Sequence, residues 1–139
     1  MKPLVIDCSV TMAWCFEDES SVFADKVLDH IGGTEAWVPS LWAFEVANVL
    51  LVAERRGRLT PADSIRFVTL LSDLPILIGE SAHERAFGPV LSNGRDLGLS
   101  AYDATYLELA MRLGAEMATG DEKLRAACRT SGVPVFDAT

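Results

Sequence analysis

The chain has 139 residues, 50% of them apolar, and a formal net charge of −8 from 20 acidic and 12 basic residues. This length suits one domain with its own hydrophobic core, so we expect a single domain over residues 1–139. The negative charge argues against binding of nucleic acid through a general basic surface. No apolar stretch is long enough to span a membrane, and three cysteines without Cys-x-x-Cys spacing favour reduced thiols and a cytoplasmic location.

The predicted elements alternate between short strands and helices. The first strand, Leu4–Ile6, has three consecutive apolar residues, which is typical of a central strand in a parallel sheet, and it ends at Asp7. Further strands are expected over residues 36–39, 75–78, 116–119 and 133–136, and helices over 10–16, 22–31, 41–56, 61–74, 101–113 and 122–130. This alternation predicts right-handed βαβ units, and hence a three-layer α/β/α sandwich with a mostly parallel sheet of about five strands.

Several helix ends carry capping signals. Asp18 or Ser20 is expected to cap the helix that follows. Thr60-Pro61-Ala62-Asp63 is a capping box with proline at the first helical position, and the helix that it starts should bury Ile65, Val68, Leu71 and Leu74. Ser81-Ala82-His83-Glu84 is a second capping box, but Gly88-Pro89 should kink or split its helix.

Four carboxylates share one placement in this topology. Asp7 follows the first strand and Asp121 follows the fourth, whereas Glu45 and Asp103 lie in the first turns of helices. Because the carboxyl ends of parallel strands meet at one edge of the sheet, we expect these side chains to lie together there.

Three of the four also have a structural interpretation. Asp121 suits a helix N-cap, and Asp103 fits a Ser-x-x-Asp capping box, where the helix dipole favours an acid. Glu45 shares one face of a nearly all-apolar helix with Asn48. That face is either a narrow solvent-exposed stripe or the place of a buried acid that needs a partner.

Four anions at one edge would repel one another, so at least one pKa should be raised and the fold destabilised. Divalent cations relieve such repulsion. Oxygen ligands, with neither His30 nor His83 close in sequence, favour Mg²⁺ or Mn²⁺. These ions activate water and stabilise charge on a phosphodiester, so the pattern indicates metal-dependent phosphodiester hydrolysis.

Motifs along essentially the whole chain carry a family resemblance: Val5-Ile6-Asp7-Cys8-Ser9, Phe44-Glu45-Val46-Ala47-Asn48, Leu99-Ser100-Ala101-Tyr102-Asp103-Ala104 and Thr119-Gly120-Asp121. In this order they resemble the PIN-domain nucleases, and most closely the VapC-type toxins of bacterial toxin–antitoxin pairs. The resemblance implies that the metal-binding and catalytic acids are Asp7, Glu45, Asp103 and Asp121, supported by Ser9, Asn48 and Thr119.

The resemblance further implies a Mg²⁺- or Mn²⁺-dependent endoribonuclease that cleaves RNA, forms a homodimer and is held inactive by a cognate antitoxin. When the four acids are left out of the count, the chain still has 16 acidic and 12 basic residues, so local cations would have to hold the RNA. Two clusters are available, and each is equally well an ordinary solvated surface: Arg55, Arg56 and Arg58, and Lys123, Arg125 and Arg129.

Other classes fit less well. A haloacid-dehalogenase-like phosphatase needs a second aspartate two residues after the first, where this chain has Ser9, and a receiver domain needs an acidic neighbour for Asp7. Nucleotide-binding glycine loops are absent from the sequence. The remaining alternative is a catalytically silent PIN-like module that binds RNA or a partner protein.

Overall fold

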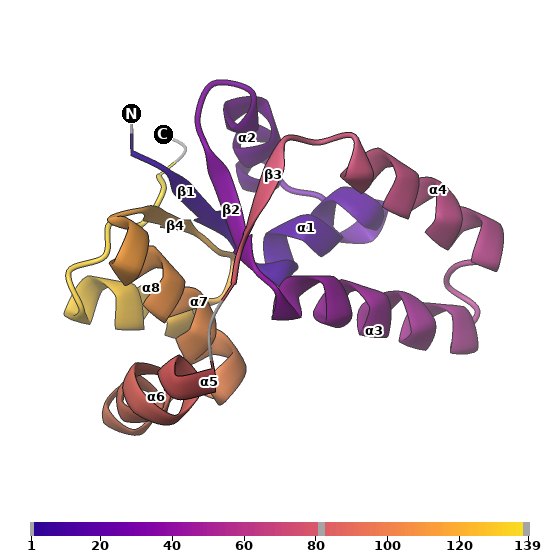
Figure 1. Cartoon of the computed structure of the whole chain (residues 1–139). Helices are drawn as coiled ribbons and strands as arrows, with labels where there is room; N and C mark the ends of the chain where they lie inside the picture. Colours follow the sequence, from indigo (N-terminus) through magenta and orange to yellow (C-terminus); the bar gives the residue numbers. More distant parts are fainter. Residues whose placement is uncertain (1, 81–82, 138–139) are drawn as a thin grey trace.

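The computed structural model describes residues 2–80 and 83–137 of the chain (Figure 1). In these residues the strands are β1 (Leu4–Ile6), β2 (Ala36–Pro39), β3 (Ile76–Gly79) and β4 (Glu116–Ala118). The helices are α1 (Cys8–Cys15), α2 (Val22–Ile31), α3 (Leu41–Arg55), α4 (Pro61–Ser72), α5 (His83–Arg85), α6 (Leu91–Leu97), α7 (Ala101–Leu113) and α8 (Glu122–Thr130). A 3₁₀ turn, η1 (Glu17–Glu19), and a π-helical turn, η2 (Ala86–Val90), complete the list.

All four strands are parallel, in the order β3-β2-β1-β4, which confirms the predicted α/β class and its parallel sheet. The strand β1 lies inside the sheet and its three residues are fully buried, as its apolar sequence predicts. The predicted strand at 133–136 is wrong: Val135 forms only an isolated bridge to Met117, so the described residues contain one strand fewer than expected. Pro134 has no backbone N–H to donate to a longer ladder.

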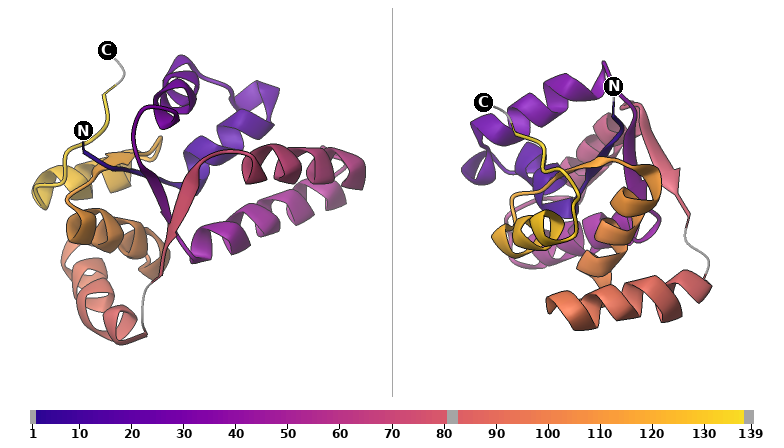
Figure 2. Two further views of the ribbon diagram at one scale, coloured as in Figure 1. Left: turned by 45° about the horizontal axis from the view of Figure 1, so that its top comes forward. Right: turned by 90° about the vertical axis from the view of Figure 1, so that its left-hand side faces the viewer.

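Helices cover both faces of the sheet, which gives the three predicted layers (Figure 2). Because side chains alternate along a strand, Leu4 and Ile6 pack with α1 and α2, whereas Val5 packs on the opposite face with α7 and α8. The helices α3 and α4 form a hairpin that extends from the sheet on the side away from α8 (Figure 1). This hairpin packs against α1 through a third apolar cluster.

The α4 capping box is present in full, because Thr60 and Asp63 exchange side-chain and backbone hydrogen bonds. The buried face of α4 nevertheless differs from the prediction. Leu71 is buried as predicted and Leu74 is half-buried, but the other buried residues are Phe67 and Ser64, whereas Ile65 and Val68 are exposed. Ser64 reaches this face because its hydroxyl donates to Glu54 Oε2 of α3 at 2.7 Å, so a polar contact between the two helices sets the rotation of α4.

Two other helix starts differ from expectation. The cap of α2 is Ser21, whose hydroxyl accepts from the Ala24 N–H at 3.0 Å. Asp18 and Ser20 lie instead in and just after η1, so the prediction that one of them caps α2 is wrong. The cap is displaced because residues 17–19 use their own backbone groups to close the 3₁₀ turn.

The glycine–proline pair splits its helix as predicted. Gly88 and Pro89 lie in η2, which separates α5 from α6. The predicted cap at Ser81 lies outside the described residues. Arg85 of α5 pairs with the buried Glu108 of α7, and Arg112 donates to the same carboxylate at 3.0 Å, so this segment is anchored on α7. None of the helices in the described part of the chain is long and apolar enough to cross a bilayer.

Candidate functional site

Asp7 lies at the carboxyl end of β1 and is 5% exposed. The register between β1 and β4 pairs Ile6 with Ala118, and the Asp7 N–H continues this ladder by donating to the Ala118 carbonyl at 3.2 Å. The next residue of the β4 side, Thr119, is thereby brought to Asp7, and its hydroxyl donates to Asp7 Oδ2. Asp7 Oδ1 accepts from the Val10 N–H at 3.1 Å, so the same carboxylate caps α1.

Glu45 lies in the second turn of α3, which follows β2. Its side chain is half-buried, and Glu45 Oε1 accepts from the buried Tyr106 hydroxyl of α7 at 2.6 Å. Glu45 therefore has a specific partner on another element. Of the two interpretations, the structure favours the acid with a partner over the solvent-exposed stripe.

Asp103 and Asp121 differ in how much they are used for capping. Asp121 Oδ1 accepts from the Lys123 N–H at 2.9 Å and caps α8, as its position predicts. The Asp103 N–H donates to the Ser100 hydroxyl at 3.1 Å, but within the described residues the Asp103 carboxylate accepts no hydrogen bond in return. The capping box at Ser100 is thus half formed, and the Asp103 carboxylate is left for another ligand.

Asp103 reaches this edge by a route that the sequence does not show. The helix α7 follows α6 and not a strand, but it must return across the sheet to enter β4, whose register with β1 is parallel. Its first turn therefore lies at the edge where β1 ends. We refer to Asp7, Glu45, Asp103 and Asp121 as the acidic edge.

The electrostatics show that these acids are neighbours. Burial raises the pKa of Asp7, and the charge of Asp103 raises it further against the hydrogen bonds from Thr119, Ser9 and Val10. Burial also raises the pKa of Glu45, which the charges of Asp103 and Asp7 raise further. The predicted raised pKa is thus confirmed, although burial is a larger cause than repulsion.

The pKa of Asp103 follows the same pattern: burial raises it first and the charge of Asp121 second, while Lys123 opposes them. Cys8, which follows Asp7, has a thiol whose pKa is raised to about 12 by burial and then by Glu45 and Asp7. Cys8 is therefore a neutral thiol at physiological pH in the metal-free fold.

The donor set of the acidic edge consists of carboxylate oxygens, which suits a hard divalent cation. Glu45 Oε2 and the Asp103 carboxylate have no hydrogen-bond donors within the described residues. In residues 2–80 and 83–137, however, no three histidine, cysteine, aspartate or glutamate side chains lie close enough together to form a ready-made metal site. The chemistry fits a hard cation, and its binding would draw the mutually repelling carboxylates together.

Two of the predicted supporting residues contact Asp7. Ser9 donates to Asp7 Oδ1 at 2.7 Å and accepts from the Gly120 N–H at 3.1 Å. Thr119 is fully buried and accepts from the Asp121 N–H at 2.9 Å while it donates to Asp7, so its hydroxyl joins two of the acids. Asn48 is exposed and makes no hydrogen bond to the four carboxylates; it lines a hollow with Arg56 and Arg58.

Sequence reasoning misses two polar residues behind the acidic edge. One is Tyr106, a buried tyrosine three residues after Asp103, and the need of a buried hydroxyl for a partner is the signal that identifies it. The other is Thr11, whose hydroxyl donates to the Asp7 carbonyl at 3.2 Å and accepts from the Trp42 indole at 2.9 Å. No feature of the local sequence predicts that long-range contact.

The two basic clusters are not equally available. Arg58 pairs with Asp18 and Glu19 and lies over the Phe16 ring at 4.1 Å, so its charge is used within the fold. The exposed Lys123 lies at the start of α8, near enough to lower the pKa of Asp103.

The other members lie further away or are partnered. Arg55 ends α3, ten residues after Glu45, or about 15 Å along the helix. Arg125 lies over the Phe23 ring at 5.1 Å, and Arg129 pairs with Glu122 at 3.2 Å. Lys123 is therefore the best-placed cation of the two clusters.

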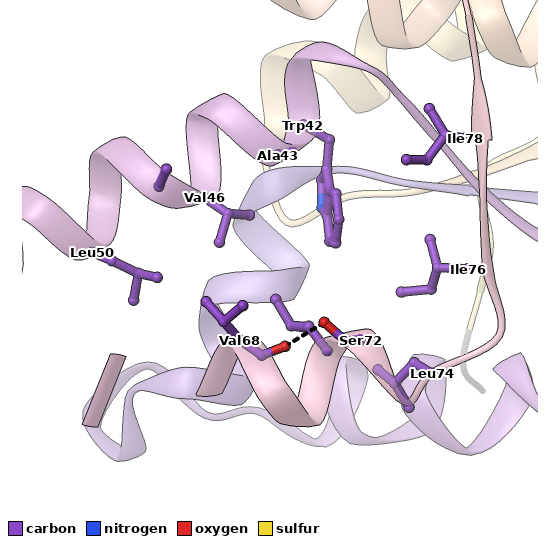
Figure 3. Close-up of a pocket in the computed structure, with 11 residues that line it drawn as sticks. Trp42, Ala43, Val46, Leu50, Val68, Ser72, Leu74, Ile76 and Ile78 are labelled. Atoms are coloured by element: carbon purple, nitrogen blue, oxygen red, sulfur yellow. Dashed lines mark hydrogen bonds between the residues drawn. The ribbon is translucent and has the colours of Figure 1, made fainter. Parts of the chain in front are cut away.

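A separate apolar groove of about 420 Å³ lies between α3, α4 and β3 (Figure 3). It is lined by Trp42, Ala43, Val46, Ala47, Leu50, Val68, Leu71, Ser72, Leu74, Ile76 and Ile78. Figure 3 shows Trp42 and Val46 pointing from α3 into this groove, with Ile76 and Ile78 of β3 opposite. None of the four acids lines it, so the apolar groove and the acidic edge are distinct surfaces.

The fold and the acidic edge together define a three-layer α/β domain that gathers carboxylates where its parallel strands end. Comparison with protein families identifies the family: the PIN domain model matches residues 4–130, and the chain belongs to the PIN domain family. The resemblance seen in the sequence motifs is thus confirmed at the level of the family.

Individual relatives agree with this placement. Ribonuclease VapC3 of Pyrobaculum aerophilum is 26% identical over 121 residues, which cover 87% of this chain and 91% of the relative. The crystal structure of PAE2754 from the same organism has a TM-score of 0.68 at 24% identity, covering 91% of this chain and 84% of that one.

Two more solved structures share the fold. One is a toxin–antitoxin complex from Klebsiella pneumoniae, with a TM-score of 0.66 at 16% identity and 98% of each chain covered. The other is FitAcB from Neisseria gonorrhoeae, with a TM-score of 0.66 at 16% identity and 97% of each chain covered.

Proposed function

We propose that this protein is a Mg²⁺- or Mn²⁺-dependent endoribonuclease and the toxin of a type II toxin–antitoxin pair. The observation that carries the proposal is the acidic edge, in which carboxylates from three separate elements lie close enough that burial first, and the charge of Asp103 after it, raises the pKa of both Asp7 and Glu45. The similarity to a relative named as a ribonuclease supports the activity, and the similarity to a toxin–antitoxin complex supports the biological role.

In this proposal Asp7, Glu45, Asp103 and Asp121 hold the cation. When bound, a divalent ion supplies a centre that activates water and neutralises charge on the scissile phosphodiester. Thr119 and Ser9 orient the Asp7 carboxylate, because both hydroxyls donate to it. The Asp103 carboxylate is the free ligand of the set.

RNA needs a cation beside the acids, since the chain as a whole is negative. We assign this role to Lys123, which is exposed and lies close to Asp103. A lysine there would hold a phosphate next to the scissile one. The distance of Arg55 from Glu45 along α3 makes that cluster a less direct choice.

The proposed protein partner is a cognate antitoxin, and we assign the apolar groove to one of its segments. The groove is lined in part by Val68 and Ile78, both of which are exposed, and a domain normally covers such a surface with a partner. The free toxin is proposed to be a homodimer. Phe44 and Phe87, each more than three-quarters exposed, are available for the contact between the two copies of the homodimer.

The test of the nuclease activity is cleavage of a structured RNA by the antitoxin-free protein, with Mn²⁺ or with EDTA. Wild type should cleave with Mn²⁺ only, and Asp7→Asn should lose the activity. Asp29→Asn, which removes an exposed carboxylate from α2, is the matched control and should cleave like wild type. Equal cleavage by wild type and Asp7→Asn would refute the assignment.

The second candidate is a silent module that binds RNA or a partner without turnover. It is favoured by one observation, that no three of the acids form a ready-made metal site in the described residues. Wild type that binds RNA but does not cleave it at any Mn²⁺ concentration would establish this alternative.

A further inference from the structure

Tyr106 joins two of the elements that build the acidic edge. It lies on α7, is 1% exposed, and donates its hydroxyl to Glu45 Oε1 on α3 at 2.6 Å. Its position three residues after Asp103 puts both side chains on one face of α7. One helix face thus carries an acid of the proposed site and the partner of a second acid.

The bond from Tyr106 is the one hydrogen bond that Glu45 receives from the described residues. It occupies Oε1 and leaves Oε2 without a donor. A half-buried carboxylate with no partner would be free to rotate. The hydroxyl opposes this rotation, because it fixes one of the two oxygens.

The phenol is suited to this task because its O–H donates to Glu45 Oε1 at 2.6 Å. A phenylalanine would fill the same space without donating.

We propose that Tyr106 is a positioning residue, which holds Glu45 by one oxygen so that the other faces a divalent cation. This inference rests on the proposed function, since it assumes that Glu45 is a ligand. Groups that hydrogen-bond to metal ligands typically contribute 10- to 100-fold to metal affinity or activity. Tyr106 is expected to lie near the lower limit, because it holds one ligand of four.

The first test is Mn²⁺ binding without RNA, measured by isothermal titration calorimetry. Tyr106→Phe should raise the Mn²⁺ dissociation constant about tenfold. Tyr102→Phe is the matched control, because it removes the exposed hydroxyl of the same helix and should bind Mn²⁺ like wild type. A Tyr106→Phe variant that folds and binds Mn²⁺ with unchanged affinity would overturn the inference.

A double-mutant cycle tests whether the effect passes through Glu45. In a Glu45→Ala background, Tyr106→Phe should leave the remaining Mn²⁺ affinity within about twofold, because the side chain that it positions is gone. A further tenfold loss in that background would show that Tyr106 acts on the whole fold and would overturn the positioning role.

A measurement on the wild-type protein avoids dependence on any variant. The chain contains 2 tyrosines, so ¹³C labelling at Cζ gives one resonance for each. Titration with diamagnetic Mg²⁺ should shift the Tyr106 resonance with the midpoint of metal binding and leave that of Tyr102 in place. Metal binding with no shift at Tyr106 would reject the inference alone, whereas wild type that binds neither Mg²⁺ nor Mn²⁺ would reject the proposed function with it.

Discussion

Replacing Asp103 by asparagine should stabilise the metal-free protein. In the folded protein, burial and then the charge of Asp121 raise the pKa of Asp103. The charge of Asp103 in turn adds to the effect of burial in raising the pKa of Asp7 and Glu45. Partly exposed charge pairs are worth about 0.2–1 kcal/mol each, so removing three repulsions gains about 0.6–3 kcal/mol, and losing the attraction to Lys123 costs about 0.2–1 kcal/mol. The loss of a negative charge from the first turn of α7 costs about 0.3–1 kcal/mol.

At the centre of these ranges the net gain is about 0.5 kcal/mol, or about 2 °C in Tm for a chain of this length. The sign follows from linkage: a carboxylate whose pKa is raised in the fold loses stability as the pH rises from its ordinary value of 3.8 through the raised one. The gain in Asp103→Asn should therefore be present at pH 7.5, absent near pH 3.5 and smaller in 1 M KCl.

Thermal unfolding in EDTA, followed by circular dichroism at both pH values, measures the difference. The Ser100 hydroxyl still accepts from the backbone N–H of residue 103 in the variant, so the cap of α7 is retained. A metal-free Asp103→Asn protein that melts below wild type at pH 7.5 would show that the helix dipole outweighs the repulsion, and the electrostatic account of the acidic edge would be wrong.

Three further outcomes are expected. Mn²⁺ at about 100 times its dissociation constant should add about 2.7 kcal/mol to the unfolding free energy of wild type, and Asp7→Asn should lose most of this gain in a thermal-shift titration. Glu108→Ala should cost about 3 kcal/mol in urea unfolding, at the lower end for buried pairs, because it leaves two partly exposed arginines without their shared carboxylate. Val68→Asp should weaken the complex with the antitoxin in a titration with the purified partner and leave RNA cleavage unchanged; Ile65→Asp, also exposed on α4 but outside the apolar groove, should change neither the complex nor the cleavage.

Much of the fold was predictable because its signals are local. The apolar run at Leu4–Ile6 and the exchange of hydrogen bonds between Thr60 and Asp63 depend on neighbours in the sequence, and both predictions are confirmed. The rotation of α4 was not predictable, because the contact from Ser64 to Glu54 that sets it joins two helices. The strand predicted at 133–136 failed although its apolar pattern is right, because its backbone pairs with Met117 alone and forms one isolated bridge.

The acids that follow strands were easier to place than the others. Asp7 and Thr119 are neighbours because the β1–β4 register continues past Ala118, and a parallel sheet implies such a meeting. Asp103 reaches the same edge through the return path of α7, which no short motif encodes. The partner of Glu45 was missed for a related reason, since Tyr106 lies 61 residues away.

The acidic edge divides into two kinds of carboxylate, and this division explains how it is tolerated without a cation. Asp7 and Asp121 cap α1 and α8, so helix N-termini offset their charge. Asp103 accepts no hydrogen bond from the described residues, and Glu45 accepts one, from Tyr106. The first pair therefore contributes to the fold whether or not an ion binds, whereas the second pair gains most from a cation. Repulsion at the edge should accordingly be relieved by changing Asp103, while removal of the Asp7 or Asp121 side chain should destabilise the helix that it caps.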